Sequence, residues 1–196
     1  MSRPIGNNPT TCISEKYLVV VNNPSPVVVV FTLSRQTGLA SIATRIRVNA
    51  YSDVRAIAET SDGQLHMAKN FVKASGGCSA PAGTNDEEAE KRRGKMKLRQ
   101  QKQGDLMQLQ LLISHPNNSG LQIDQISRLW IPADYVNDVR IFFNSDEIIS
   151  FSGGISMSEN PSIRFYFKPD KKGTLLAEIK DSKGREYRDS WPLANP

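Results

Sequence analysis

The stretch Asn22-Asn23-Pro24-Ser25-Pro26-Val27-Val28-Val29-Val30-Phe31-Thr32-Leu33 decides the fold class of this chain. Its first five residues contain two prolines, which cannot continue a helix and are typical of a turn. The next seven are rich in β-branched residues and have the length of a strand. Residues 17–21, before the turn, have the same character. The stretch therefore predicts two strands joined by a turn.

The same pattern extends in both directions. In residues 42–48, apolar and polar positions alternate, which predicts a half-buried strand with Arg45 and Arg47 on its outer face. Residues 54–60 and 64–73 flank the turn Ser61-Asp62-Gly63, which is a hairpin signal. Further strands are expected at residues 106–114, 138–143, 147–151, 162–167, 174–180 and 186–190. Short strands at this spacing predict an all-β chain of antiparallel sandwiches.

A charged segment separates the two strand-rich blocks. Residues 79–83 are small, and residues 84–87 are typical of a helix start. Residues 86–102 contain four acidic and seven basic side chains but few apolar ones, so such a helix has little to bury. We expect a first domain over residues 1–78, a flexible and charged, partly helical linker over 79–104, and a second domain over 105–196. A plain charged linker is an equally good interpretation.

Composition limits the function classes. The chain has 196 residues and a formal net charge of +5, and no apolar run approaches the roughly 18 residues that span a bilayer. No signal peptide is visible at the start, which leaves a cytosolic protein or a processed chain open. The basic cluster of residues 91–102 has no interleaved aromatic residues, which argues against nucleic-acid binding. No cofactor motif and no metal-ligand spacing is present.

Cys78, in Ser75-Gly76-Gly77-Cys78-Ser79-Ala80-Pro81, is the main candidate for chemistry. Glycines leave a thiol unshielded and let the backbone swing, so Gly76 and Gly77 predict a flexible arm and Cys78 a covalent attachment site. A strand-end cysteine of no consequence is the alternative from spacing alone.

Other candidates for chemistry are weaker. A Cys–His dyad with His66 or His115 would suit a thiol hydrolase, but the more ordinary interpretation of both histidines is structural. Cys12 is open to three roles: a disulfide with Cys78, a link to another chain, or none.

Several motifs of the first block resemble SoxY, the sulfur-carrying subunit of bacterial sulfur-oxidation systems. They are Asn23-Pro24-Ser25-Pro26, Thr44-Arg45-Ile46-Arg47-Val48, Asp62-Gly63-Gln64-Leu65-His66 and Phe71-Val72-Lys73-Ala74-Ser75-Gly76-Gly77-Cys78. The second block resembles the partner subunit SoxZ. The residues that carry this likeness are His115-Pro116, Gly120, Ile131-Pro132-Ala133, Gly154-Ile155-Ser156, Asn160-Pro161-Ser162-Ile163-Arg164-Phe165 and Gly173-Thr174-Leu175. The chain thus resembles a fused SoxYZ-like carrier of the kind associated with quinoprotein dehydrogenases.

The resemblance implies two immunoglobulin-like β-sandwiches packed on each other in the periplasm, with no catalytic turnover of their own. It implies a thiol carrier that holds a sulfur or other thiol-reactive intermediate on Cys78 and presents it to sulfur-oxidation-type or quinoprotein dehydrogenase-associated enzymes. A scaffold module that recruits a quinoprotein dehydrogenase, with an incidental cysteine, is the alternative.

Three departures from the family pattern matter. In SoxY the Gly-Gly-Cys-Gly-Gly arm ends the chain, whereas here Ser79-Ala80-Pro81 follows, so the thiol is tethered on both sides. The first block looks short at its N-terminus, and a missing strand would leave an open sheet edge that pairs with another copy, as a homo-oligomer, or with the second block. The SoxZ-like block has Ser114 and Asn117-Asn118 where that family favours a Lys and a Met-Glu pair, which puts partner contacts there in question.

Overall fold

Strands dominate the computed structural model, which describes residues 12–80 and 86–193. Within these ranges, twelve strands form two antiparallel sheets, accompanied by one short α-helix and one 3-10 turn. In chain order the elements are β1 (Ile13–Val20), β2 (Val27–Leu33), η1 (Arg35–Thr37), β3 (Ala43–Thr44), β4 (Ser52–Thr60), β5 (Leu65–Val72), α1 (Asp86–Arg92), β6 (Met96–Gln103), β7 (Leu106–Ile113), β8 (Val136–Phe143), β9 (Asp146–Gly153), β10 (Ser162–Phe167), β11 (Thr174–Asp181) and β12 (Glu186–Pro192). The predicted all-β class is confirmed. No helix in the described part of the chain is long and apolar enough to cross a bilayer.

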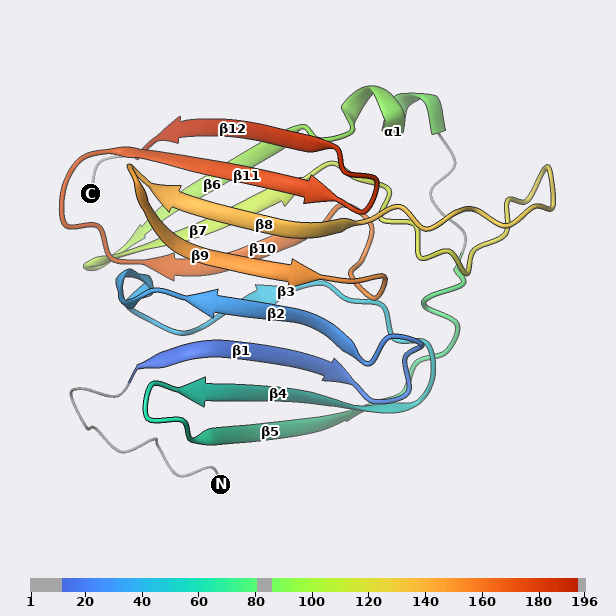
Figure 1. Ribbon diagram of the computed structural model, residues 1–196, viewed down its shortest axis with the longest axis horizontal. Helices are drawn as coiled ribbons and strands as arrows, with labels where there is room; N and C mark the ends of the chain where they lie inside the picture. The colour runs from blue at the N-terminus through green and yellow to red at the C-terminus, as the bar shows by residue number, and fades with distance from the viewer. Residues whose placement is uncertain (1–11, 81–85, 194–196) are drawn as a thin grey trace.

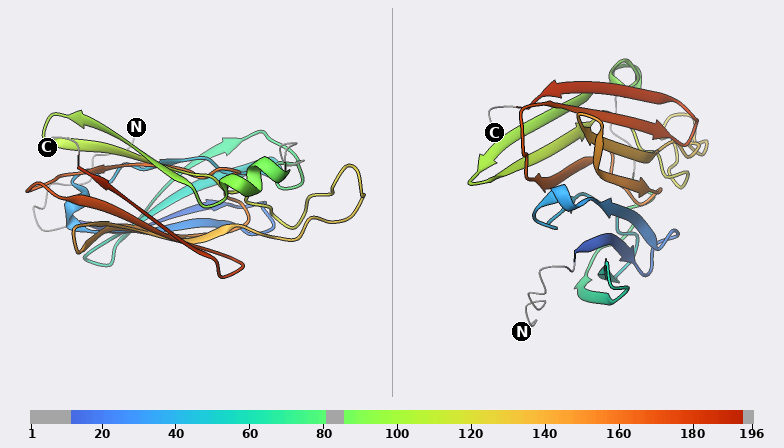
Figure 2. Two further views of the ribbon diagram at one scale, coloured as in Figure 1. Left: turned by 90° about the horizontal axis from the view of Figure 1, so that it is seen from above. Right: turned by 60° about the vertical axis from the view of Figure 1, so that its left-hand side comes forward.

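The two sheets are unequal in size. The larger one has the order β12-β11-β8-β9-β2-β1-β4-β5, and the smaller one the order β3-β10-β7-β6. The larger sheet forms the front layer in Figure 1, and the smaller sheet lies behind its upper part. Seen from above in Figure 2, the two layers face each other as in a sandwich. The small sheet does not extend over β5, most of whose side chains are exposed.

The two strand-rich blocks are joined by direct strand pairing. β2 from the first block pairs with β9 from the second, with Phe31 opposite Phe151 and Leu33 opposite Ile149. The Phe31 and Phe151 rings also contact each other, with centroids 5.6 Å apart. The β2 edge of the first block is therefore closed by the second block of the same chain, whereas β5 forms an outer edge of the larger sheet.

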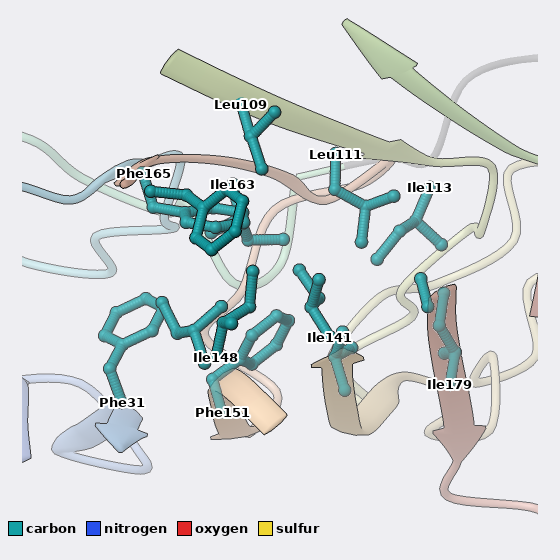
Figure 3. Close-up of a cluster of buried hydrophobic side chains, with 14 of the residues drawn as sticks. Phe31, Leu109, Leu111, Ile113, Ile141, Ile148, Phe151, Ile163, Phe165 and Ile179 are labelled. Carbon is teal, nitrogen blue, oxygen red and sulfur yellow. The ribbon is translucent and has the colours of Figure 1, made fainter. Parts of the chain in front are cut away.

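A hydrophobic core lies between the sheets (Figure 3). The side chains of β7 alternate between the core and the outer face, so that Leu109, Leu111 and Ile113 point inward. They face Ile141 of β8 and Ile179 of β11 across the sandwich. Burying each such side chain contributes about 1.5–3 kcal/mol. The core thus depends on residues that alternation alone identifies.

Two segments differ from the sequence prediction. The expected strand at 42–48 is reduced to β3 and one further bridge, between Ile46 and Met157. Its course is broken because Arg47 makes hydrogen bonds inward instead of lying on the outer face.

In the predicted linker, only α1 is helical, whereas Met96–Gln103 forms β6 and pairs with β7. Leu98 and Met96 of this strand pack against the core, so it belongs to the sandwich. Residues 1–11 and 81–85, including the start of the chain and most of the small segment expected to be flexible, lie outside the described residues.

Candidate functional site

The Cys78 segment follows β5 and runs beside the end of the 42–49 segment. The backbone N–H of Gly76 donates to the Asn49 carbonyl at 2.7 Å, and that of Gly77 donates to the Val48 carbonyl at 3.1 Å. Ser79 closes a turn by donating its N–H to the carbonyl of Gly76 at 3.1 Å. The segment is therefore fixed by backbone hydrogen bonds on the N-terminal side of the cysteine.

The two glycines serve close packing in this conformation. Gly76 has φ +72°, a left-handed conformation that favours glycine. A Cβ on Gly77 would lie 2.5 Å from the Val48 carbonyl oxygen and 2.9 Å from the Val48 nitrogen. The absence of side chains at Gly76 and Gly77 thus lets the segment dock against its neighbour. Their role as a flexible arm stays a prediction.

We expected an unshielded thiol, but Cys78 is fully buried, with 0% of its surface exposed. The guanidinium of Arg47 and the hydroxyl of Ser156 both influence the pKa of its thiol. Burial raises the pKa of the Cys78 thiol, and the charge of Arg47 and a hydrogen bond with Ser156 oppose the rise without cancelling it. In this closed conformation the thiol is therefore a protonated and weak nucleophile.

The guanidinium of Arg47, whose charge acts on the thiol, is held in place by backbone carbonyls. Its Nη1 donates to the carbonyls of Asn117 and Met157, both at 2.6 Å. Burial lowers the pKa of Arg47, while the nearby Cys78 and Glu159 act in the opposite direction. The guanidinium thus lies between the two blocks without a carboxylate within ion-pair distance in the described structure.

Asn23 in the turn between β1 and β2 fixes Ser156 against the thiol. Its Nδ2 donates to Ser156 Oγ at 2.9 Å and to the Arg47 carbonyl at 2.8 Å. Its Oδ1 accepts from the Asn49 backbone N–H at 2.8 Å. Ser156 Oγ in turn donates to the Ser25 carbonyl at 3.1 Å. A turn of the first block and a loop of the second therefore build one wall around Cys78.

A second wall comes from the long loop between β7 and β8, which projects on the right of Figure 1. The hydroxyl of Ser119 donates to the Cys78 carbonyl, and Gln122 Nε2 donates to the Ala80 carbonyl at 3.0 Å. Gln122 Oε1 also accepts from the Ser119 N–H at 2.9 Å. Both side chains are buried. We call Ser119 and Gln122 the clamp, because together they hold the backbone on the C-terminal side of the thiol.

The far end of the same loop presents apolar side chains. Ile123 and Trp130 form a bridge, and Asp124 accepts hydrogen bonds from the backbone at Ile126 and Ser127. At the tip, Ile126 is 95% exposed. Leu129 and Trp130 are exposed as well. The end of the loop that carries the clamp is therefore a hydrogen-bonded structure with exposed apolar side chains.

A buried ion-pair network anchors the base of this loop. Arg93 Nη1 donates to Asp134 Oδ2 at 3.1 Å, and Arg185 donates to both Asp134 oxygens and, through Nε at 2.6 Å, to Asp181. His115 Nε2 lies 3.6 Å from both Asp134 and Asp181. The histidine and the two carboxylates are close enough to hold a metal ion. However, two guanidiniums already neutralise the carboxylates, so the network fits a structural role.

Neither histidine forms a dyad with the thiol. His115 Nδ1 accepts from the Asn117 N–H at 3.1 Å, and its other nitrogen faces Arg93 and the two carboxylates. His66 lies on β5 opposite Ala58, near the β4–β5 turn. The described geometry gives a thiol hydrolase no base.

Cys12 lies far from Cys78. It precedes β1 and accepts a hydrogen bond from the Ser61 N–H in the β4–β5 turn. Cys78 lies beyond the opposite end of β1, and eight residues of strand span about 26 Å. Both cysteines are free in the structure. The arrangement therefore excludes a Cys12–Cys78 disulfide within one chain of this conformation.

Sequence reasoning identified the cysteine and its glycines but missed the clamp, Arg47 and Asn23 as its surroundings. Asn23, Arg47 and Ser156 stood within motifs that resembled the two families, but no pattern linked them to the thiol. Ser119 and Gln122 gave no signal, because a loop serine and glutamine are ordinary surface residues.

The comparisons with known proteins agree with the division into two blocks. The family model for sulfur oxidation protein SoxY matches residues 6–78, and the model for sulphur oxidation protein SoxZ matches residues 96–192. No curated protein matches the chain.

Among solved structures, hypothetical protein PH1083 from Pyrococcus horikoshii OT3 aligns over 53% of this chain and 90% of its own, at 17% identity and a TM-score of 0.38. That likeness is too low to bear on function.

The two family matches follow each other in one polypeptide and together span both strand-rich blocks and the site between them. SoxY and SoxZ are carrier components of sulfur oxidation rather than catalytic ones. The chain therefore belongs to the SoxYZ-like proteins, with a SoxY-like part and a SoxZ-like part fused in that order.

Proposed function

We propose that this protein is a periplasmic carrier that holds a sulfur intermediate covalently on Cys78 and presents it to partner enzymes. One observation carries the proposal: the buried thiol lies beside Arg47, a half-buried cation with no paired carboxylate within the described residues. An inert structural cysteine would instead be surrounded by bulky apolar side chains. A negatively charged adduct on the sulfur would supply the counter-charge that the neutral thiol does not.

The loading chemistry is consistent with this charge. Joining thiosulfate to the thiol forms one S–S bond between Cys78 Sγ and the outer sulfur of the ion. The thiol loses its proton to solvent, and the two sulfurs lose two electrons to an oxidising partner enzyme. The adduct bears one negative charge, beside the guanidinium of Arg47. We therefore expect Arg47 to favour an anionic cargo over a neutral one.

Loading and unloading require that the thiol become accessible. We call residues 76–80 the carrier segment. In the closed conformation the clamp donates to the carbonyls of Cys78 and Ala80. On the N-terminal side of the thiol, the N–H groups of Gly76 and Gly77 donate to backbone carbonyls of the neighbouring segment. None of these hydrogen bonds belongs to the β2–β9 ladder that joins the two blocks. The carrier segment can therefore open while the sandwich remains intact.

The deciding experiment is intact-mass spectrometry of the protein isolated from its native host, before and after reduction, followed by peptide mapping. We expect a reducible mass increment on Cys78 and none on the Cys78→Ser variant. The unfolding free energy of the variant should lie within about 1 kcal/mol of the wild-type value. A thiol that stays unmodified under all sulfur-supplied growth conditions would refute the carrier function.

Arg47→Gln tests the charge argument separately. This substitution keeps a donor toward the Asn117 and Met157 carbonyls but removes the charge. When both proteins are loaded with thiosulfate under a chemical oxidant, the variant should release the anionic adduct faster. A methyl disulfide on Cys78, which is neutral and can be reduced in the same way, provides the matched comparison.

A second candidate function, a scaffold that recruits a quinoprotein dehydrogenase, is favoured by the exposed apolar loop tip at Ile126, Leu129 and Trp130. If it applies, the Cys78→Ser variant binds the dehydrogenase as strongly as the wild type does. Substitution of Trp130 by Ser would then abolish the binding.

A further inference from the structure

The outer face of the small sheet carries a group of cations drawn from three neighbouring strands. The strand register places Arg99 of β6 and Arg164 of β10 on either side of Gln110 of β7. In the next row, Lys97 and Ser162 flank Leu112. Because side chains two residues apart share a face of a strand, Lys97, Arg99 and Arg164 project from the same face of the sheet.

Arg45 adds a fourth cation from the segment beside β10. Together with Arg99 and Arg164, it lines a cleft of about 490 Å³ whose other lining residues are uncharged. Arg45 also lines an adjoining cleft of about 330 Å³ with Arg92, Lys95 and Lys97. The second cleft has one carboxylate, Glu159, among its lining residues. The two clefts form a continuous strip, which we call the basic strip: Arg45, Arg92, Lys95, Lys97, Arg99 and Arg164.

These cations are not committed to partners within the protein. Among the residues that the structure describes, no ion pair involves any member of the basic strip. The guanidinium of Arg45 donates to the Asn160 carbonyl at 3.3 Å, and that of Arg92 donates to the Glu88 carbonyl at 3.3 Å. Arg93 and Arg185 nearby differ in this respect, because both bind the carboxylate of Asp134.

We propose that the basic strip is the docking surface for an acidic segment of a partner enzyme that loads or unloads Cys78. This inference rests on the carrier function proposed above. Six cations against one carboxylate provide charge complementarity to a run of Asp and Glu side chains. Guanidinium groups also suit carboxylates because they can donate two hydrogen bonds to one carboxylate.

The geometry disfavours other occupants. No Phe, Tyr or Trp side chain lines either cleft, so the strip lacks the stacking platforms that single-stranded nucleic acid requires. The strip extends over several strands, which is larger than one inorganic oxyanion needs.

Its position suits delivery of cargo. Arg45 of the strip and Arg47 beside the thiol belong to the same short segment. A partner seated on the strip would therefore lie next to the carrier segment.

The test uses the full chain and a defined probe, a fluorescein-labelled decapeptide of alternating Glu and Asp, measured by fluorescence anisotropy at low ionic strength. The probe should bind the wild type and lose affinity as salt rises. Arg99→Gln combined with Arg164→Gln should raise the dissociation constant about fivefold, corresponding to about 1 kcal/mol. The matched control is Lys171→Gln with Lys172→Gln, which removes the same charge from an exposed turn outside both clefts and should leave binding within about twofold.

The outcomes separate this inference from the carrier function. Equal weakening by the two double variants would mean that only net charge attracts the probe, and would overturn the proposal. So would displacement of the probe by sulfate well beyond the effect of sodium chloride at equal ionic strength, since the site would then bind small oxyanions. The Cys78→Ser variant should bind the probe as the wild type does. The Arg99/Arg164 variant should still load cargo under a chemical oxidant, so a failure of loading alone refutes only the carrier function.

Discussion

Removing the clamp should expose Cys78 without unfolding the protein. The perturbation is Ser119→Ala together with Gln122→Met, which removes the donors to the Cys78 and Ala80 carbonyls while nearly preserving side-chain volume. A neutral hydrogen bond contributes about 1 kcal/mol net, and 1.4 kcal/mol is a factor of about ten in an equilibrium constant. Each single substitution should therefore raise the opening constant of the carrier segment about fivefold. The double variant should raise it roughly twenty- to thirtyfold.

The assay is the rate of Cys78 alkylation by iodoacetamide, followed by peptide mass spectrometry in a Cys12→Ser background. When closing is faster than alkylation, the observed rate is the opening constant multiplied by the rate for the free thiol, so it rises by the same factors. Ser127→Ala is the matched control. It removes a hydroxyl from the exposed end of the same loop, where Ser127 Oγ donates to Asp124 and accepts from the Leu129 N–H, both outside the Cys78 segment. It should leave the rate within about twofold.

Urea unfolding must be measured on the same variants. Local opening predicts that the opening constant derived from the labelling rate exceeds the global unfolding constant of the same variant. If the labelling rates of the double variant and the wild type agree within about twofold, the clamp does not hold the segment. If the opening constant derived from the labelling rate equals the global unfolding constant of each variant, the thiol becomes exposed only by global unfolding. Either result refutes the local gate.

Two further predictions follow from the same geometry. Gly77→Ala places a methyl group 2.5 Å from the Val48 carbonyl oxygen and should cost about 1–3 kcal/mol of unfolding free energy and accelerate Cys78 alkylation. Gly63→Ala is also strained, because Gly63 has φ +77°, but it lies in the β4–β5 turn with nothing within 4 Å of its Cβ and should not accelerate the alkylation. Burial lowers the pKa of His115 below its ordinary value of 6.5, so the unfolded chain takes up a proton that the folded chain refuses, and stability should fall as pH drops below about 6.5. Urea midpoints at pH 7.5 and 5.5 measure this loss, which His115→Asn should reduce; an equal loss in that variant would show that other groups cause it.

The strands could be predicted because they follow from local patterns. Residues 27–33 and 106–113 show their β-branched or alternating character without reference to any other segment. β6 was missed because its alternation of Met96 and Leu98 with Lys97 and Arg99 lies within a charge-rich stretch. In that context, charge suggested a linker, whereas the charges lie on the outer face of a strand whose other face packs against the core.

The surroundings of Cys78 could not be predicted because they depend on distant segments. A glycine before a cysteine is compatible both with a flexible arm and with close packing. Only the position of Val48, 29 residues earlier in the chain, shows that packing applies here. Ser119 reaches the Cys78 carbonyl from 41 residues later. Arg47 was placed on the outer face by alternation, but the carbonyls of Asn117 and Met157 draw its guanidinium inward.

The closed state can be weighed against the need to open. Four hydrogen bonds hold the carrier segment: two from the N–H groups of Gly76 and Gly77, and two from the clamp. At about 1 kcal/mol each, they favour the closed state by about 4 kcal/mol, so about one molecule in a thousand is open at a given moment. A thiol exposed that rarely is protected from stray oxidants, yet docking of a partner can supply a free energy of this size. Because the Cys78 segment is tethered at both ends, the proposed carrier function requires a partner to drive opening instead of relying on reach. We expect it to act on Ser119 and Gln122, which hold the segment closed.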